Sequence, residues 1–401
     1  MTASSAQFPA VVPEENIDRA GRGLRPMWGV RSFAAVALIT AVMPALLLDE
    51  SNARLVVPIV GVAAAGLAVG EWFAERGSSR RPARREFDRS FGVSLVWVFA
   101  LGEVVGLLLA GAFNTLSIEA VYSGYQYGVV STVSRMLMAL TAPAVALAVW
   151  SNHRGWLSAR TTWILSGGLV LLTLAVSLKG GYLSVAIPVG VVFLVLGSMT
   201  HLIRLRHLAV GTVLLAVLLP LMFQVRDDVR EDLGGTRSSE VVGPMERFRV
   251  DLLMSDLENA VPASWVDLPD PGLLARTAVV PRVLDPQRPI IDVGQQITYA
   301  RGFGNANNST FGHYGNVFWM YSWLGVACVS LSLGVLFGLG FRLFDSGVGA
   351  ILLSAVTAPT VWLEAAFPAY WSGIVQSLLL SFSVVAVTWL VRQIGGAGRR
   401  V

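Results

Sequence analysis

Residues 281–325 read PRVLDPQRPIIDVGQQITYARGFGNANNSTFGHYGNVFWMYSWLG and mark the boundary on which the fold depends. The first part of this stretch is polar and rich in arginine, glycine and asparagine, whereas its last part opens a long apolar run. A polar segment that passes into about 20 mainly apolar residues is typical of a loop entering a membrane-spanning helix. The stretch therefore predicts a polar site where a long loop meets the bilayer.

The composition of the whole chain is that of an integral membrane protein. Hydrophobic residues make up 54% of the 401 residues and charged residues only 14%, with a mean hydropathy of +0.62. A soluble globular chain carries about 25% charged residues. We therefore expect an all-α polytopic membrane protein. Its net charge of +4 reflects membrane topology and does not indicate nucleic-acid binding.

Apolar runs long enough to cross a bilayer recur along the chain. We place about ten spans, at residues 32–48, 55–73, 91–112, 128–150, 162–178, 182–199, 208–224, 317–340, 348–367 and 373–391. They divide the chain into an N-terminal tail (1–31), a first helical group (32–224), a large polar loop (225–316), a second helical group (317–391) and a C-terminal tail (392–401). Within the loop, Pro244 to Ala260 predicts an amphipathic helix that lies on the membrane or caps the bundle.

The arginines predict the orientation of the chain. Arginine-rich connections, such as ERGSSRRPARREFDR at 75–89, alternate with short connections that are poor in arginine. Basic residues are retained on the cytoplasmic side of a membrane. We therefore expect both termini in the cytoplasm, the 225–316 loop outside, and the protein in the cytoplasmic membrane.

The outer loop contains the first candidate residues for chemistry. His313 is the one histidine that this topology places outside, at the bilayer edge. A neutral imidazole there takes a proton from a sugar hydroxyl near neutral pH; the alternative is a structural histidine bonded to loop backbone. Arg282, Arg288 and Arg301 lie in the same loop. Guanidinium groups bind phosphate oxygens bidentately and stabilise a departing pyrophosphate; the alternative is exposed loop charge.

Further candidates lie inside or beside the apolar spans. Lys179 occupies a Lys-Gly-Gly turn, where it either binds a ligand or snorkels to the membrane surface. Glu103 and Arg135 lie within spans, where charges are usually paired or functional. We expect them to form an ion pair, which either lines a hydrated cavity or is purely structural. Trp319 either stacks on a sugar ring or belongs to the interfacial aromatic belt.

Metal-binding motifs are missing from the expected outer face. The loop has no HExxH sequence, no His/Cys cluster with metal-ligand spacing and no DxD sequence. We therefore expect a metal-independent mechanism without a cofactor.

The loop and the helix that follows it resemble a known family. The similarity rests on PR at 281–282, PQRP at 286–289, ST at 309–310 and GHYGNVFWMYSWLG at 312–325. These motifs resemble Wzy-type polysaccharide repeat-unit polymerases, a group related to the O-antigen ligases. The SLKGG turn at 177–181 is similar to a Ser-Arg-Gly-Gly turn of that group, with lysine in place of arginine. Ligase-like members have adjacent His and Asn, whereas Tyr314 and Gly315 separate these residues here.

The resemblance implies a GT-C-like fold and a metal-independent glycosyltransferase of polysaccharide biosynthesis in the cell envelope, making O-antigen or exopolysaccharide. Such an enzyme transfers the growing glycan from undecaprenyl pyrophosphate to the next lipid-linked repeat unit. For such a reaction we expect His313, Arg282 and Arg288 to be the catalytic residues, with His313 activating or positioning the acceptor and the two arginines holding the pyrophosphate. The residues expected to bind the substrate are Lys179, Arg135, Arg301, Tyr314, Trp319 and Glu103. The implied partners are the undecaprenyl-pyrophosphate-linked oligosaccharide, membrane lipids, a flippase and a chain-length regulator.

Two alternatives to the polymerase stay open. A ligase would move the glycan to another acceptor, which the sequence does not identify. A flippase for lipid-linked oligosaccharides would belong to a different class, namely transporters. Transporters commonly show repeated halves, which we do not find in this sequence, so we favour the polymerase.

Overall fold

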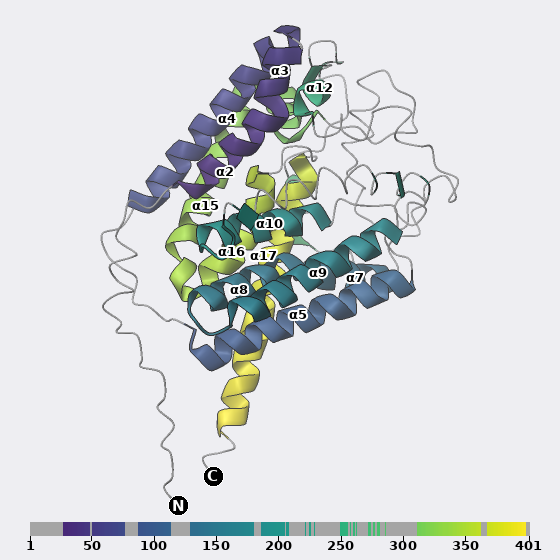
Figure 1. The fold of residues 1–401 in the computed structure, drawn as a ribbon, viewed down its shortest axis with the longest axis vertical. Helices are drawn as coiled ribbons and strands as arrows, with labels where there is room; N and C mark the ends of the chain where they lie inside the picture. Colours follow the sequence, from purple (N-terminus) through teal and green to yellow (C-terminus); the bar gives the residue numbers. More distant parts are fainter. Residues whose placement is uncertain are drawn as a thin grey trace, which may run out of the picture.

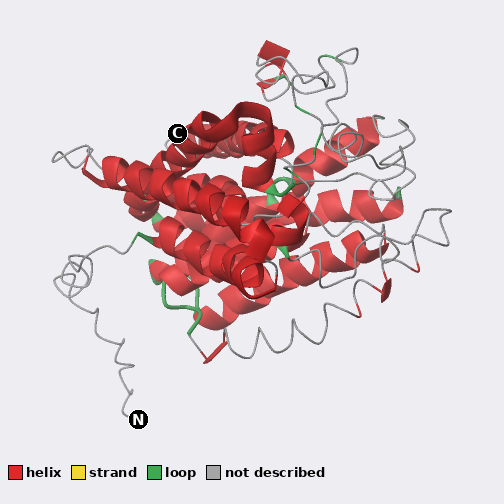
Figure 2. Cartoon of the chain, turned by 90° about the horizontal axis from the view of Figure 1, so that it is seen from above, coloured by secondary structure: helices red, strands yellow, loops and turns green. Residues whose placement is uncertain are grey.

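The computed structural model describes residues 27–48, 50–76, 87–113, 129–179, 186–204, 206–207, 249–255, 311–361 and 367–397, together with single positions between 221 and 285. Every regular element in these residues is helical (Figures 1 and 2). In chain order they are α2 (Trp28–Ala37), η1 (Leu38–Val42), α3 (Met43–Leu48), α4 (Glu50–Arg76), α5 (Arg89–Ala112), α7 (Val129–Met138), α8 (Thr141–His153), α9 (Ala159–Lys179), α10 (Ala186–Met199), α12 (Val250–Ser255), α15 (His313–Arg342), η7 (Phe344–Ser346), α16 (Val348–Val361) and α17 (Phe367–Ala397). The expected all-α class is confirmed for this part of the chain.

Seven helical stretches in the described residues are long and apolar enough to cross a membrane. They are Trp28–Leu48, Ala53–Arg76, Arg89–Ala112, Val129–His153, Ala159–Lys179, His313–Arg342 and Gly373–Ile394. Two of the expected spans appear as the shorter apolar helices α10 and α16, and most of the expected span 208–224 lies outside the described residues. Large apolar side chains such as Leu101, Leu108 and Leu171 point outward from their helices. This surface suits lipid, so the chain is a multi-pass membrane protein.

The closest helix pair joins α4 to α15, which run in the same direction. Small residues recur every four positions on both helices: Gly66, Gly70 and Ala74 on α4, and Ser330, Gly334 and Gly338 on α15. A Cβ atom at Gly70 would lie 2.7 Å from the Val335 nitrogen, and one at Gly334 would lie 2.9 Å from the Leu67 Cα. The backbones therefore touch, as in the close packing of membrane helices through small residues.

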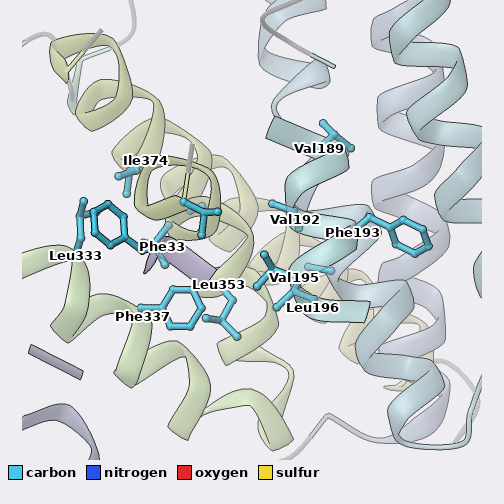
Figure 3. Packing of buried hydrophobic residues seen from close by; sticks show 14 of the residues in the cluster. Phe33, Val189, Val192, Phe193, Val195, Leu196, Leu333, Phe337, Leu353 and Ile374 are labelled. Carbon is cyan, nitrogen blue, oxygen red and sulfur yellow. The ribbon is translucent and has the colours of Figure 1, made fainter. Parts of the chain in front are cut away.

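The centre of the bundle is filled by α8 and α16. Most side chains of these two helices are buried, and α16 contacts α2, α8, α10 and α15. Figure 3 shows Phe33 and Phe337 on one side of Leu353, with the valines of α10 on the other. The few polar side chains buried on these two helices are hydroxyls, such as Ser151, Thr357 and Thr360.

One end of the bundle is closed by aromatic rings and an ion pair. Phe87, Phe91, Trp150 and Trp156 pack edge to face, with ring centroids 4.9 to 6.0 Å apart. At the same end, Asp88 caps α5 by accepting a hydrogen bond from the Phe91 amide. Arg392 of α17 bonds both oxygens of Asp88, at 2.7 and 3.0 Å. The start of α5 is thereby tied to the last turns of α17.

The fourth expected span, at 128–150, is not one continuous helix. The structure divides it at Ala139 and Leu140 into α7 and α8. Pro143 lies in the first turn of α8 and has no N–H group for the carbonyl of Ala139, four residues earlier. The Ser377 hydroxyl of α17 contacts that carbonyl at 3.5 Å. Proline thus explains the break, which places irregular backbone inside the bundle.

Candidate functional site

The first turn of α15 has a fixed shape that positions two polar rings. Gly312, just before the helix, has φ 77° and ψ 168°, a conformation that favours glycine. The Phe311 amide donates a hydrogen bond to the Asn316 side chain at 2.8 Å, and the Asn316 amide donates to the Gly312 carbonyl at 2.9 Å. These bonds set the direction in which the helix begins.

His313 and Tyr314 occupy this turn side by side. Their ring centroids lie 4.8 Å apart with the rings perpendicular, and Tyr314 also packs edge-on against Phe33 of α2 at 5.4 Å. Both side chains are fully buried. The Tyr314 hydroxyl has no hydrogen-bond partner among the described residues. A buried hydroxyl without a hydrogen-bond partner costs about 1–3 kcal/mol. The Tyr314 hydroxyl is therefore suited to a hydrogen bond with a bound ligand.

The protein encloses His313 completely, which was not predicted from the sequence. Its expected position at the bilayer edge stays a prediction. Met254 and Leu257, from the loop range 225–316, lie with Phe311 against Gly315 in the same turn. The short helix α12 to which Met254 belongs packs on α3, η1 and α4. The described part of the expected amphipathic helix therefore caps the bundle and helps to cover the start of α15.

The remaining candidates of the 281–325 stretch are Trp319 on α15 and three arginines of the loop. Trp319 is half-buried on α15, and its ring lies 5.8 Å from that of Phe311, as part of the core packing. Arg282, Arg288 and Arg301 lie outside the described residues. Their expected binding of pyrophosphate stays a prediction.

The expected ion pair between Glu103 and Arg135 is not formed among the described residues. Glu103 is fully buried on α5, and one of its oxygens accepts a hydrogen bond from the Thr173 hydroxyl of α9, at 3.4 Å. The reason is the rotation of α7, whose Ser131, Ser134 and Met138 occupy its buried face. Arg135 is one position beyond that face and is only half-buried.

Lys179 has a structural contact at the other end of α5. Its ammonium group donates a hydrogen bond to the Gly111 carbonyl at 3.0 Å. Gly111 lies in the last turn of α5, where carbonyls lack helical partners and positive charge is favourable. Lys179 is exposed and stabilises this helix end; its expected role in substrate binding is a separate prediction.

The structure thus separates the candidates into two groups. His313, Tyr314 and Trp319 share α15, whereas Glu103, Arg135 and Lys179 lie on α5, α7 and α9. Within the described chain, no three His, Cys, Asp or Glu side chains gather as a metal site.

Glu71 is a buried acid that was not predicted from the sequence. Glu71 of α4 is almost fully buried, and its two oxygens accept hydrogen bonds from the Gly29 and Val30 amides of α2. An acidic residue within an apolar span was the signal that would have found it.

A scan against models of protein families, a search of curated proteins and a search of solved structures each found no match.

Proposed function

We propose that the protein is a glycosyltransferase of the bacterial cytoplasmic membrane that polymerises lipid-linked oligosaccharide repeat units at the outer face. The observation that supports this function best is the buried pair of His313 and Tyr314 at the first turn of α15. This pair lies where the polar 225–316 loop ends and within the stretch that resembles repeat-unit polymerases.

The proposed reaction uses His313 as a general base. Its imidazole accepts the proton of an acceptor sugar hydroxyl, and the resulting oxygen attacks the anomeric carbon of the donor glycan. The bond between that carbon and undecaprenyl pyrophosphate then breaks, and the pyrophosphate leaves with the bonding electrons. Arg282 and Arg288 stabilise its growing negative charge, and the Tyr314 hydroxyl provides a hydrogen bond to the bound sugar.

Burial of His313 supports this proposal in a second way. A glycosyltransferase must keep water from replacing the acceptor sugar, because water would hydrolyse the donor. A fully buried imidazole packed against the Tyr314 ring is shielded from bulk water. A surface imidazole would lack that protection.

The experiment is an elongation assay with purified protein and undecaprenyl-pyrophosphate-linked repeat units in lipid vesicles containing EDTA. We expect the wild type to form polymers. His313→Gln, which keeps the volume of the ring but removes the base, should reduce the rate at least about 100-fold. His153→Gln, at the opposite end of the bundle, is the matched control and should elongate normally. Normal elongation by His313→Gln would contradict the general-base role, and transbilayer movement of the substrate without elongation would indicate a flippase.

A further inference from the structure

Glu103 has a neighbourhood that differs from that of Glu71, another buried acid inside a membrane span. Glu103 is 0% exposed. One of its carboxylate oxygens faces Thr173 at 3.4 Å, and the other has no hydrogen-bond partner among the described residues. By contrast, two backbone amides donate to the oxygens of Glu71.

No described cation is paired with Glu103. The charged groups on the helices packed around it are Arg89 on its own helix, Arg135 on α7, His153 on α8, Arg160 and Lys179 on α9, and Arg392 on α17. Lys179 bonds the Gly111 carbonyl, and Arg392 bonds Asp88. None of these side chains forms an ion pair with Glu103 among the described residues.

The hydroxyls beside Glu103 are already committed as donors. Thr173 donates to the Leu169 carbonyl at 2.7 Å, a much shorter contact than its 3.4 Å to Glu103. Thr141, whose side chain also interacts with Glu103, donates to the Met138 carbonyl at 2.7 Å. Each hydroxyl has a single proton. The proton of each hydroxyl is therefore shared with a backbone carbonyl, and Glu103 receives only a weak hydrogen bond from Thr173.

The break between α7 and α8 lies next to this cluster, since Thr141 is the first residue of α8. The break leaves the Ala139 carbonyl without the usual helical donor, because Pro143 has none to give. Interrupted membrane helices present such carbonyls to Na⁺ or protons. An ionised carboxylate without a partner inside a membrane costs several kcal/mol, and a bound cation would remove that cost.

We propose that Glu103, Thr141 and Thr173 form an intramembrane site for a monovalent cation. The cation is either a proton carried by Glu103 or Na⁺ held between these side chains and the backbone at the α7–α8 break. The proposal does not depend on the glycosyltransferase function, because its residues lie on α5, α8 and α9 and the proposed general base lies on α15.

The test measures the melting temperature of purified full-length protein in lipid nanodiscs, for the wild type and Glu103→Gln. The two are compared in NaCl and in choline chloride of equal ionic strength, between about pH 5 and pH 9. Glutamine has the shape of a protonated glutamate and needs no cation. If Na⁺ is bound, NaCl should raise the wild-type melting temperature by about 2–4 °C, and Glu103→Gln should not respond. If a proton is bound, the wild type should lose stability as pH rises, while Glu103→Gln should not.

Three further variants make the outcome decisive. Glu71→Gln changes an acid that already has two amide donors, so it should keep the wild-type response to Na⁺. Thr173→Val removes one acceptor oxygen and should weaken that response, whereas Thr173→Ser should retain it. If Glu103→Gln does not fold, the comparison of Thr173→Val with Thr173→Ser decides. The proposal would be overturned if the wild type, Glu103→Gln and Thr173→Val all showed the same dependence of melting temperature on Na⁺ and pH.

Discussion

The Glu71 carboxylate of α4 accepts a hydrogen bond from the Gly29 amide at 2.9 Å and thereby closes the N-terminus of α2. Its second oxygen accepts the Val30 amide at 3.0 Å. The residue before α2, Met27, supplies no side-chain cap. Free amides at a helix start carry partial positive charge and need acceptors. A side chain from another helix thus does the work of a local cap and joins α2 to α4.

We predict that Glu71→Ala destabilises the protein by about 2–4 kcal/mol, because buried amides lose their acceptor. Glu71→Gln retains one acceptor oxygen and should lose roughly half as much. The measurement is chemical unfolding in detergent, followed by tryptophan fluorescence. Equal stability of Glu71→Ala and the wild type would show that water satisfies these amides instead.

The contact between α4 and α15 predicts opposite effects for two glycines. A Cβ at Gly334 would meet the Leu67 backbone, which cannot move aside cheaply. Gly334→Ala should therefore cost about 1–3 kcal/mol. Gly61 lies on α4 with open space around it, so Gly61→Ala should be neutral or slightly stabilising, since alanine favours the helix. Melting temperatures of both variants test this, and a neutral Gly334→Ala would contradict direct backbone contact.

Asp88 predicts a pH-dependent contribution at the end of α5. The Phe91 amide, followed by the Arg392 guanidinium, holds the pKa of Asp88 below its ordinary value. A lowered folded-state pKa means that the stabilisation is present above the unfolded pKa of about 4 and is lost as pH falls through the folded value. Asp88→Ala should cost about 1 kcal/mol at neutral pH, as for other helix caps.

The measurement for Asp88 is the stability difference between wild type and Asp88→Ala as a function of pH. The difference should be constant above about pH 5 and should shrink at lower pH. Arg392→Gln is the companion variant, and it should remove only part of the effect because the amide bond of Phe91 remains. A difference that stays unchanged in acid would exclude the ionised carboxylate as its source.

Hydropathy predicted most of the long apolar helices among the described residues, because a run of about 20 apolar residues matches the thickness of the bilayer core. The expected span 162–178 matches α9 (Ala159–Lys179), and 91–112 matches α5 (Arg89–Ala112). The break in the fourth span was missed, although Pro143 was visible in the sequence. Proline within an apolar run is tolerated in membranes only when neighbours satisfy the freed backbone. Whether Ser377 would do so cannot be known before the helices are packed.

Side-chain partners were harder to predict than spans, because they depend on the rotation of each helix about its axis. The sequence predicted an ion pair between Glu103 and Arg135 because both are charged residues within membrane spans. Gly106 of α5, however, packs against Leu137 and Met138. That close approach turns Arg135 away from Glu103. Small residues decided the rotation, and their effect appears only once the neighbouring helix is known.

The arginines of the polar loop give the last prediction. If Arg282 and Arg288 bind the pyrophosphate through two parallel hydrogen bonds each, lysine should replace them poorly, since an ammonium group cannot reproduce the fork. In the elongation assay, Arg282→Lys and Arg288→Lys should be nearly as slow as the corresponding alanine variants. Arg230→Lys, in the same loop but outside the stretch that resembles the polymerases, is the control and should be active. Full activity of the lysine variants would indicate a need for charge alone, and full activity of the alanine variants would remove these arginines from the site.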